Sequence, residues 1–164
     1  MKKIFLCVAF FLASLCVFAD PAEGFWISVD ENSGKETAGW QIFQENGVLC
    51  GKILSVAEQA QDVKAFSATG KSYSNFYDGV DIGTLFVVGT KWIWDLKNSS
   101  SGKWSGGFVI DPQNGKRYKC EITFRKADGK KFVVDTLEMR GKVGPFGRSQ
   151  FWKKASQEDA SSLK

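Results

Sequence analysis

The sequence predicts an all-β protein built as a single antiparallel, up-and-down barrel. Several segments alternate apolar and polar residues with a period of two, and turn-rich segments separate them every 8 to 12 residues or so. One predicted strand contains the pair Gly106-Gly107, which marks a bulge or a sharp bend. An antiparallel sheet that bends while keeping one apolar face tends to close into a barrel.

The hairpin at residues 103–124 shows this pattern best. After its turn, Tyr118, Cys120, Ile122 and Phe124 alternate with polar residues. The turn holds a proline, which presets φ, and an Asn-Gly pair, which tolerates positive φ. We therefore expect two strands joined by a tight turn, with one apolar face.

The remaining strands follow from the same alternation. An Asn46-Gly47 turn, typical of a hairpin, joins two of them. In another, Trp92, Trp94 and Leu96 are expected to share one face. Together with the hairpin this gives about eight or nine strands, the others spanning residues 24–29, 38–44, 48–56, 84–88, 91–97, 132–140 and 148–153.

The stretch between the strands at 48–56 and 84–88 breaks the rhythm. Residues 57–66 have a helix-friendly composition, and residues 67–83 form a long loop rich in Gly, Ser, Asn and Asp. The loop also carries Tyr73, Phe76 and Tyr77. These aromatic side chains either form a lid or recognition patch, or pack on the protein's own barrel.

Both ends of the chain are predicted to lie outside the barrel domain, residues 20–154. Residues 1–19 resemble a signal peptide, with two lysines, an apolar run and a small-residue cleavage site before Asp20. The apolar run is short for a membrane anchor, and Leu15 before Cys16 disfavours a lipoprotein. Residues 155–164 are small and polar, which predicts a disordered tail. We expect a periplasmic or secreted protein without a stable membrane span.

Charge and cysteine content narrow the function further. Without Lys2 and Lys3 the net charge of +4 falls to about +2, and the charges are interspersed, so we expect no nucleic-acid partner. Cys50 is in phase with polar Lys52, whereas Cys120 lies on the apolar face of its strand. Residues on opposite faces of a wall cannot be bridged without backbone movement, which argues against a disulfide.

No catalytic or metal-binding constellation is visible. The chain has no His, which excludes a His-based triad and His-ligated metals. Two of its four cysteines lie in the predicted signal peptide, and the two that remain are too few for a cysteine zinc site. A pair of carboxylates can hydrolyse a glycoside, but nothing singles out two of the apolar-flanked acids. These acids are Asp81, Asp95, Asp111, Asp135 and Glu138. We therefore expect no enzymatic activity, no cofactor and no metal.

The six tryptophans are the other signal. Large aromatic rings either fill a barrel core, line a ligand cavity, or stack on sugars or peptides at the surface, and the sequence leaves these readings open. The candidates for a ligand site are Trp40, Trp92, Trp94, Trp104 and Tyr118.

A series of motifs in order resembles the DUF2147 family of exported bacterial proteins. The resemblance extends over the mature domain and is specific because the motifs occur together; within residues 57–83 the chain lacks the cysteine pair that the family often carries, so no metal or redox role is carried over. The motifs are residues 20–26 (DPAEGFW), 46–53 (NGVLCGKI), 91–97 (KWIWDLK), 106–120 (from Gly-Gly to Tyr-Lys-Cys), 139–141 (MRG) and 146–152 (FGRSQFW).

The resemblance implies a lipocalin-like β-barrel. Gly24-Phe25-Trp26 is similar to the Gly-x-Trp opening of lipocalins, in which the Trp closes one end of the barrel and an Arg near the end of the chain packs over it. Arg148 is the candidate for that cation–π contact and Arg140 the second. Trp26 and Arg148 are thus expected to close the barrel rather than form a site.

Two functions of different kinds follow. The first is non-enzymatic binding of a small hydrophobic or amphipathic molecule in the open end of the barrel, because about eight strands leave room for either side chains or one small ligand. The second is a protein-interaction scaffold of the cell envelope, acting through Tyr73, Phe76 and Tyr77 in the 67–83 loop.

Overall fold

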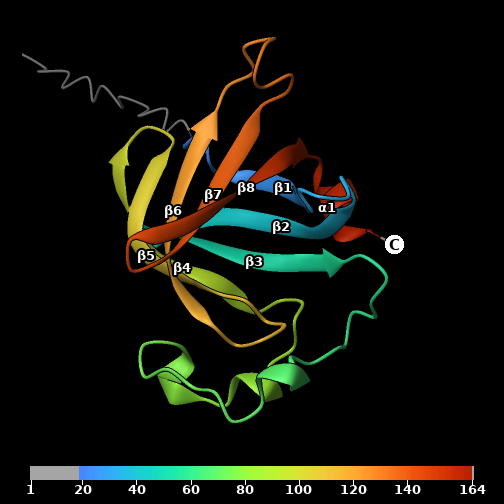
Figure 1. The fold of residues 1–164 in the computed structure, drawn as a ribbon, viewed down its shortest axis with the longest axis vertical. Coiled ribbons are helices and arrows are strands. Elements are labelled where there is room, and N and C mark those ends of the chain that lie inside the picture. The colour runs from blue at the N-terminus through green and yellow to red at the C-terminus, as the bar shows by residue number, and fades with distance from the viewer. Residues whose placement is uncertain (1–18, 164) are drawn as a thin grey trace, which may run out of the picture.

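The computed structural model describes residues 19–163 and shows a closed antiparallel barrel of eight strands (Figure 1). Each strand pairs with the next, and β8 pairs with β1, which confirms the predicted up-and-down barrel. Residues 1–18, most of the expected signal peptide, lie outside the described residues. The strands are β1 (Gly24–Val29), β2 (Glu36–Glu45), β3 (Val48–Val56), β4 (Lys91–Ser100), β5 (Lys103–Ile110), β6 (Arg117–Arg125), β7 (Thr136–Val143) and β8 (Phe146–Ala155).

The predicted turn and bend are confirmed. Asn46 and Gly47 have φ values of 52° and 79°, as a two-residue hairpin turn between β2 and β3 requires. The β5–β6 register shifts between Trp104 and Gly107, which is a bulge. A Cβ on Gly107 would lie 2.3 Å from the carbonyl oxygen of Trp94, so only glycine allows β4 to approach this closely.

The segment between β3 and β4, residues 57–90, is called the insertion below. It contains neither the predicted helix at 57–66 nor the predicted strand at 84–88, and both predictions are wrong. In their place are three short 3-10 turns and an isolated bridge between Lys64 and Phe86. The turns are η1 (Phe66–Ala68), η2 (Tyr77–Gly79) and η3 (Ile82–Thr84).

The β7–β8 hairpin also differs from the prediction. β7 begins at Thr136 instead of 132, and the two strands extend beyond their predicted limits of 140 and 148, so that only Gly144-Pro145 separates them. Residues on both sides of this pair stay in the ladder, because Val143 still pairs with Phe146.

Bulky side chains fill the centre of the barrel. Trp40 stacks on Trp152 with ring centroids 4.7 Å apart. Trp26, Ile122 and Leu137 are fully buried in the same core. An eight-stranded barrel is narrow enough for such side chains to occupy its interior.

The residues before β1 close one end of the barrel. The Trp26 Nε1 donates a hydrogen bond to the carbonyl oxygen of Ala22 (3.0 Å). The Asp20 carboxylate accepts one from Trp104 Nε1 (3.0 Å) and another from the backbone N–H of Gly102 (2.9 Å). The polar edges of two core tryptophans are therefore satisfied by the first residues of the predicted mature chain.

Lys154, not Arg148, lies over Trp26, so the predicted contact is wrong. The Lys154 Nζ is 4.2 Å from the Trp26 ring centroid, while Arg148 pairs with Glu31 at 3.3 Å. The register explains the difference, since Trp26 lies directly opposite Lys154 on β8. Arg148 lies six residues earlier, which is about 20 Å along an extended strand.

The C-terminal segment is ordered through Leu163, so the prediction of a disordered tail is wrong for those residues. Ser156 caps a short helix, α1 (Gln157–Ser161), by accepting a hydrogen bond from the N–H of Asp159. The fully buried Ala160 packs against β2 and β3, and its carbonyl oxygen accepts a hydrogen bond from Ser55 Oγ (2.8 Å). A Cβ on Gly39 would lie 1.7 Å from that oxygen, so this glycine permits the helix to dock.

Cys50 and Cys120 are both free and buried. Cys50 does not lie on a solvent-facing surface as its phase with Lys52 predicts, because the insertion covers this part of the outer wall. Burial raises the pKa of both thiols.

Candidate functional site

The insertion packs its aromatic side chains on the outer wall of the barrel. Phe76 is only 2% exposed, and its ring centroid lies 4.7 Å from that of Trp94 and 5.8 Å from that of Trp92. Tyr73 is held by its hydroxyl, which donates to the carbonyl oxygen of Gly115 (2.9 Å). Of the three loop aromatics, Tyr77 remains well exposed, at 46%.

Trp92 and Trp94 pack against Phe76 of the insertion, whereas the fully buried Ile93 and Leu96 lie on the core side of the wall, opposite Gly51 and Leu49. The predicted common face for Trp92, Trp94 and Leu96 is therefore wrong. The cause is Asp95, whose φ of 60° accompanies register shifts between β3 and β4 and changes the phase of the strand.

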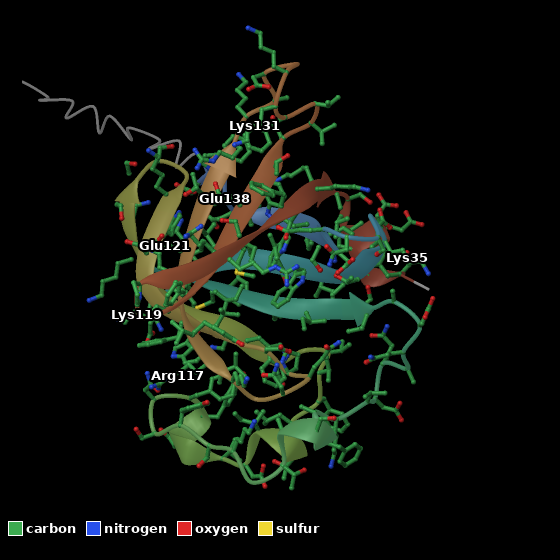
Figure 2. All side chains as sticks on the ribbon, in the orientation of Figure 1. Lys35, Arg117, Lys119, Glu121, Lys131 and Glu138 are labelled. Carbon is green, nitrogen blue, oxygen red and sulfur yellow. The ribbon has the colours of Figure 1, made fainter. Side chains whose placement is uncertain are left out.

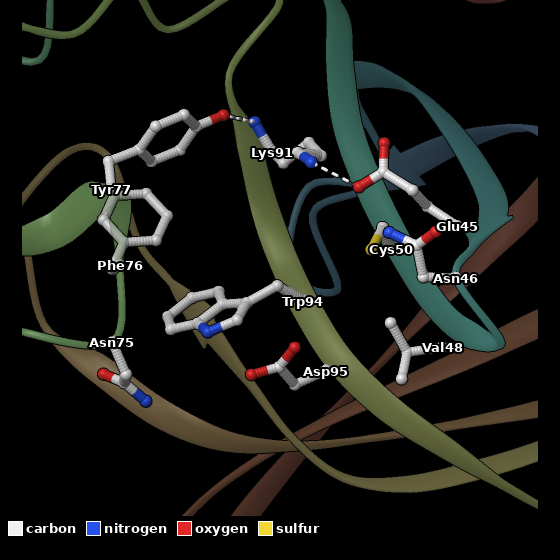
Figure 3. A pocket seen from close by; sticks show the side chains of 10 residues that line it. All are labelled: Glu45, Asn46, Val48, Cys50, Asn75, Phe76, Tyr77, Lys91, Trp94 and Asp95. Atoms are coloured by element: carbon white, nitrogen blue, oxygen red, sulfur yellow. Dashed lines mark hydrogen bonds and ion pairs between the residues drawn. The ribbon is translucent and has the colours of Figure 1, made fainter.

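A pocket of about 430 Å³ lies where the insertion meets β4 and the β2–β3 hairpin (Figure 3). It is on the outside of the barrel wall, and both polar and aromatic side chains line it. The lining residues are Glu45, Asn46, Val48, Cys50, Asn75, Phe76, Tyr77, Lys91, Trp94 and Asp95. We call this the insertion pocket.

Unusual backbone conformations surround the insertion pocket. Tyr77, Asp78 and Asp95 have φ values of 44°, 52° and 60°, which non-glycine residues seldom adopt. The conformation of Tyr77 brings its hydroxyl to the backbone N–H of Lys91, from which it accepts a hydrogen bond (3.1 Å). Such strained residues cluster at functional sites, which motivates a functional hypothesis for this pocket.

The charged groups of the insertion pocket are partly paired. Lys91 Nζ donates to the Glu45 carboxylate at 2.6 Å, and this hydrogen bond raises the pKa of Lys91. Asp95 is exposed at the opposite side of Trp94 (Figure 3). Burial is the chief cause that raises the pKa of the Cys50 thiol, which disfavours the reactive thiolate form.

Trp94 has a buried donor without an acceptor. The residue is 8% exposed, and within residues 19–163 its Nε1 is the one buried side-chain nitrogen or oxygen that lacks a hydrogen-bond partner. Figure 3 shows the indole nitrogen on the ring edge nearer Asp95. Because most buried polar groups in proteins are paired, this orphan N–H requires an explanation.

The five candidate ligand-site aromatics do not come together. Of the five, Trp94 alone lines the insertion pocket. Trp40 stacks inside the barrel, Trp104 bonds to Asp20, and Trp92 donates to the carbonyl oxygen of Val87 (2.7 Å). Tyr118 is half-buried beside Gly141.

The polar members of the insertion pocket were not singled out from the sequence, except for Asp95 among the apolar-flanked acids. The other four of those acids serve the backbone or ion pairs: Asp81 and Asp135 accept backbone hydrogen bonds, Asp111 closes its turn, and Glu138 binds Arg125. The Trp94-Asp95 pair near Lys91 combines an aromatic ring with two charged groups, as a ligand pocket does. The sequence alone does not show that the insertion covers this part of the strand and forms a pocket there.

Residues 19–163 contain neither a cluster of metal-ligating side chains nor a helix suited to crossing a membrane. No three Cys, Asp or Glu side chains in this range are grouped so that they can hold a metal ion. No helix in the same range has the length and apolar character needed to cross a bilayer.

A closed eight-stranded antiparallel barrel with a tryptophan-sealed end defines a lipocalin-like class, and a comparison with solved structures agrees. The structure of HP1028 from Helicobacter pylori, described as belonging to the lipocalin family, matches with a TM-score of 0.63. The alignment covers 84% of this chain and 85% of that one, at 17% sequence identity, a likeness of fold.

The family model of DUF2147, described as an uncharacterized protein conserved in bacteria, matches residues 24–154. The chain therefore belongs to the DUF2147 family, which confirms the resemblance in the sequence motifs. A comparison with curated proteins found no match.

Proposed function

We propose that the insertion pocket binds one small amphipathic molecule without catalysing a reaction. The observation that carries the proposal is the buried N–H without a partner on Trp94, a residue that lines a pocket of about 430 Å³. Ligand pockets of this size commonly hold a few placed polar groups among apolar ones. A ligand oxygen or nitrogen would satisfy the orphan donor.

The lining defines the chemistry of the ligand. It needs a hydrogen-bond acceptor for Trp94 Nε1 and an apolar or ring face to pack on the exposed Tyr77. A hydroxyl or amine on the ligand has an acceptor in Asp95, whose carboxylate is exposed. Lys91 and Glu45 pair with each other, so neither is free to act as an acid or base on a ligand.

The packed barrel interior supports a ligand site at another position than the open end of the barrel that the sequence suggested. The centre is occupied by the stacked Trp40 and Trp152 and by fully buried aliphatic side chains. The outer wall, covered by the insertion, offers the space that the interior lacks. This supports binding beside the barrel instead of inside it.

The proposed location is the periplasm or the outside of a bacterial cell. The lysine-initiated apolar segment at residues 1–19 supports export, and the family is described as conserved in bacteria. The ligand would then be a molecule of the cell envelope or its surroundings.

Native mass spectrometry of protein purified from its own cells tests the proposal. We expect a bound small molecule on the wild type and on Trp92→Phe, and none on Trp94→Phe. The two variants remove the same N–H group from neighbouring positions of β4, but only Trp94 lines the insertion pocket. Equal occupancy in both variants would place the ligand elsewhere.

The scaffold hypothesis keeps support from the exposed face of the insertion. Phe66, Val80 and Phe86 are exposed there, whereas Tyr73 and Phe76 are used within the chain itself. Under this second proposal, an envelope protein docks on the exposed apolar side chains. Phe66→Ser with Phe86→Ser would then reduce recovery of a crosslinked partner without changing ligand occupancy, and unchanged crosslinking would reject it.

A further inference from the structure

The loop between β6 and β7, residues 126–135, projects away from one end of the barrel (Figure 1). Val133 and Val134 in this loop are 81% and 52% exposed. Two adjacent apolar side chains on a projecting loop are unfavourably hydrated, and a partner that buries them would stabilise the pair.

The base of the loop is fixed. The Phe132 ring lies 5.9 Å from that of Phe151 on β8. Behind it is a cavity of about 360 Å³, whose lining includes Val29, Val133 and Trp152. The valine pair is thus presented on an anchored support beside an apolar recess.

The basic and acidic side chains of the loop differ in whether they have partners. Lys126, Lys130 and Lys131 are exposed, and none of them forms an ion pair with another residue of the described chain, 19–163 (Figure 2 labels Lys131). The two acids instead accept backbone hydrogen bonds within the loop. Asp128 accepts from the N–H of Phe132 (3.0 Å) and of Lys130 (2.8 Å), and Asp135 accepts from Ala127 (2.9 Å).

We propose that the 126–135 loop docks on an anionic lipid bilayer. Val133 and Val134 enter the boundary between head groups and acyl chains, and the three lysines lie at the level of the phosphates. Lysine stems cover apolar surface while their ammonium groups reach anionic head groups, which is how interfacial anchors combine both forces. This proposal does not depend on the insertion pocket.

Charge complementarity favours a bilayer as the occupant. Three lysines without ion pairs in the same loop as two exposed valines match a surface of repeated anionic groups over hydrocarbon. Each lysine near such a surface strengthens binding about fivefold. The apolar recess behind the loop also gives room for the end of an acyl chain.

Vesicle flotation tests the proposal with the chain from Asp20 to Lys164, which holds all eight strands and the core. We expect binding to vesicles of phosphatidylcholine mixed with phosphatidylglycerol, and much weaker binding to phosphatidylcholine alone. Val133→Ser with Val134→Ser should weaken binding by about tenfold or more. Lys130→Gln with Lys131→Gln should weaken it by about 25-fold.

Val143→Ser is the matched control, because Val143 is 60% exposed at the last position of β7, the end away from the 126–135 loop. It should bind as the wild type does. Raising the salt to about 1 M, where the Debye length falls to about 3 Å, should release the protein. Absence of binding, equal binding to neutral and anionic vesicles, or an equal loss in the control would overturn the proposal.

Discussion

Replacing Trp94 with Phe should leave the ligand-free protein about as stable as the wild type, whereas Trp92→Phe should destabilise it. Both residues are buried on the same face of β4, and both pack against Phe76. The two substitutions remove comparable ring area, so the loss of packing is similar. They differ in the polar group that each one removes.

The magnitude follows from the hydrogen bonds. Trp92 Nε1 donates a hydrogen bond to the carbonyl oxygen of Val87 at 2.7 Å. Trp92→Phe removes this donor and leaves the buried carbonyl without it, at a cost of about 1–3 kcal/mol. Trp94 Nε1 has no acceptor, so Trp94→Phe removes an unpaired donor and recovers a similar amount. The free energies of unfolding of the two variants should therefore differ by at least about 2 kcal/mol.

Urea unfolding of the three proteins, followed by circular dichroism after the ligand has been removed by refolding, measures this difference. A common m-value would show that the variants share one unfolded reference. If Trp94→Phe is destabilised as much as Trp92→Phe, the Trp94 N–H already has a partner such as a fixed water. The argument for a ligand acceptor at Trp94 would then fail.

Three further outcomes are expected. Lys154→Met should reduce the free energy of unfolding by about 0.5–2 kcal/mol because it removes the cation over Trp26, whereas Arg148→Met should change it by less than about 0.5 kcal/mol, as measured by urea unfolding. Asp20→Ala should cost about 1–3 kcal/mol in the same assay, since it leaves a core indole N–H and a backbone N–H without their acceptor. Burial of Glu138 works against its charged form, but hydrogen bonds from an arginine and a serine outweigh it and lower the pKa of this carboxyl. The stability that Glu138 contributes is present above its unfolded pKa of about 4.3 and is lost as the pH falls from there through its folded pKa. In thermal melts over this pH range, the melting temperature of Glu138→Gln should fall less steeply with pH than that of the wild type, and an equally steep fall would contradict the linkage.

Local patterns predicted the barrel well because the alternation and the turn residues of each hairpin determine its structure. Residues 103–124 alternate with a period of two, and the bulge falls at the Gly106-Gly107 pair as expected. The Asn46-Gly47 turn likewise needs only the positive φ that its two residues tolerate. In both cases the backbone conformation is determined by a few neighbouring residues.

The wrong predictions depend on features that neither local alternation nor composition reveals. The orientation of Trp92 and Trp94 depends on an extra residue at Asp95 in a strand whose alternation otherwise looks regular. The order of the C-terminal segment depends on Gly39 and Ser55, more than 100 residues earlier in the chain, which admit and bond Ala160. No composition rule for a small polar tail contains that information.

The same reasoning explains why the candidate site lies outside the barrel. Trp40 and Trp152 stack across the interior and leave the centre to side chains. The phase change at Asp95 turns Trp94 outward, where a bare wall would expose it to water. The insertion then covers Trp94 with Phe76 but brings no acceptor to its Nε1. A fold that only needed to bury a ring here would be about as stable with Phe at position 94, so the unpaired N–H is the feature that most directly indicates a bound molecule.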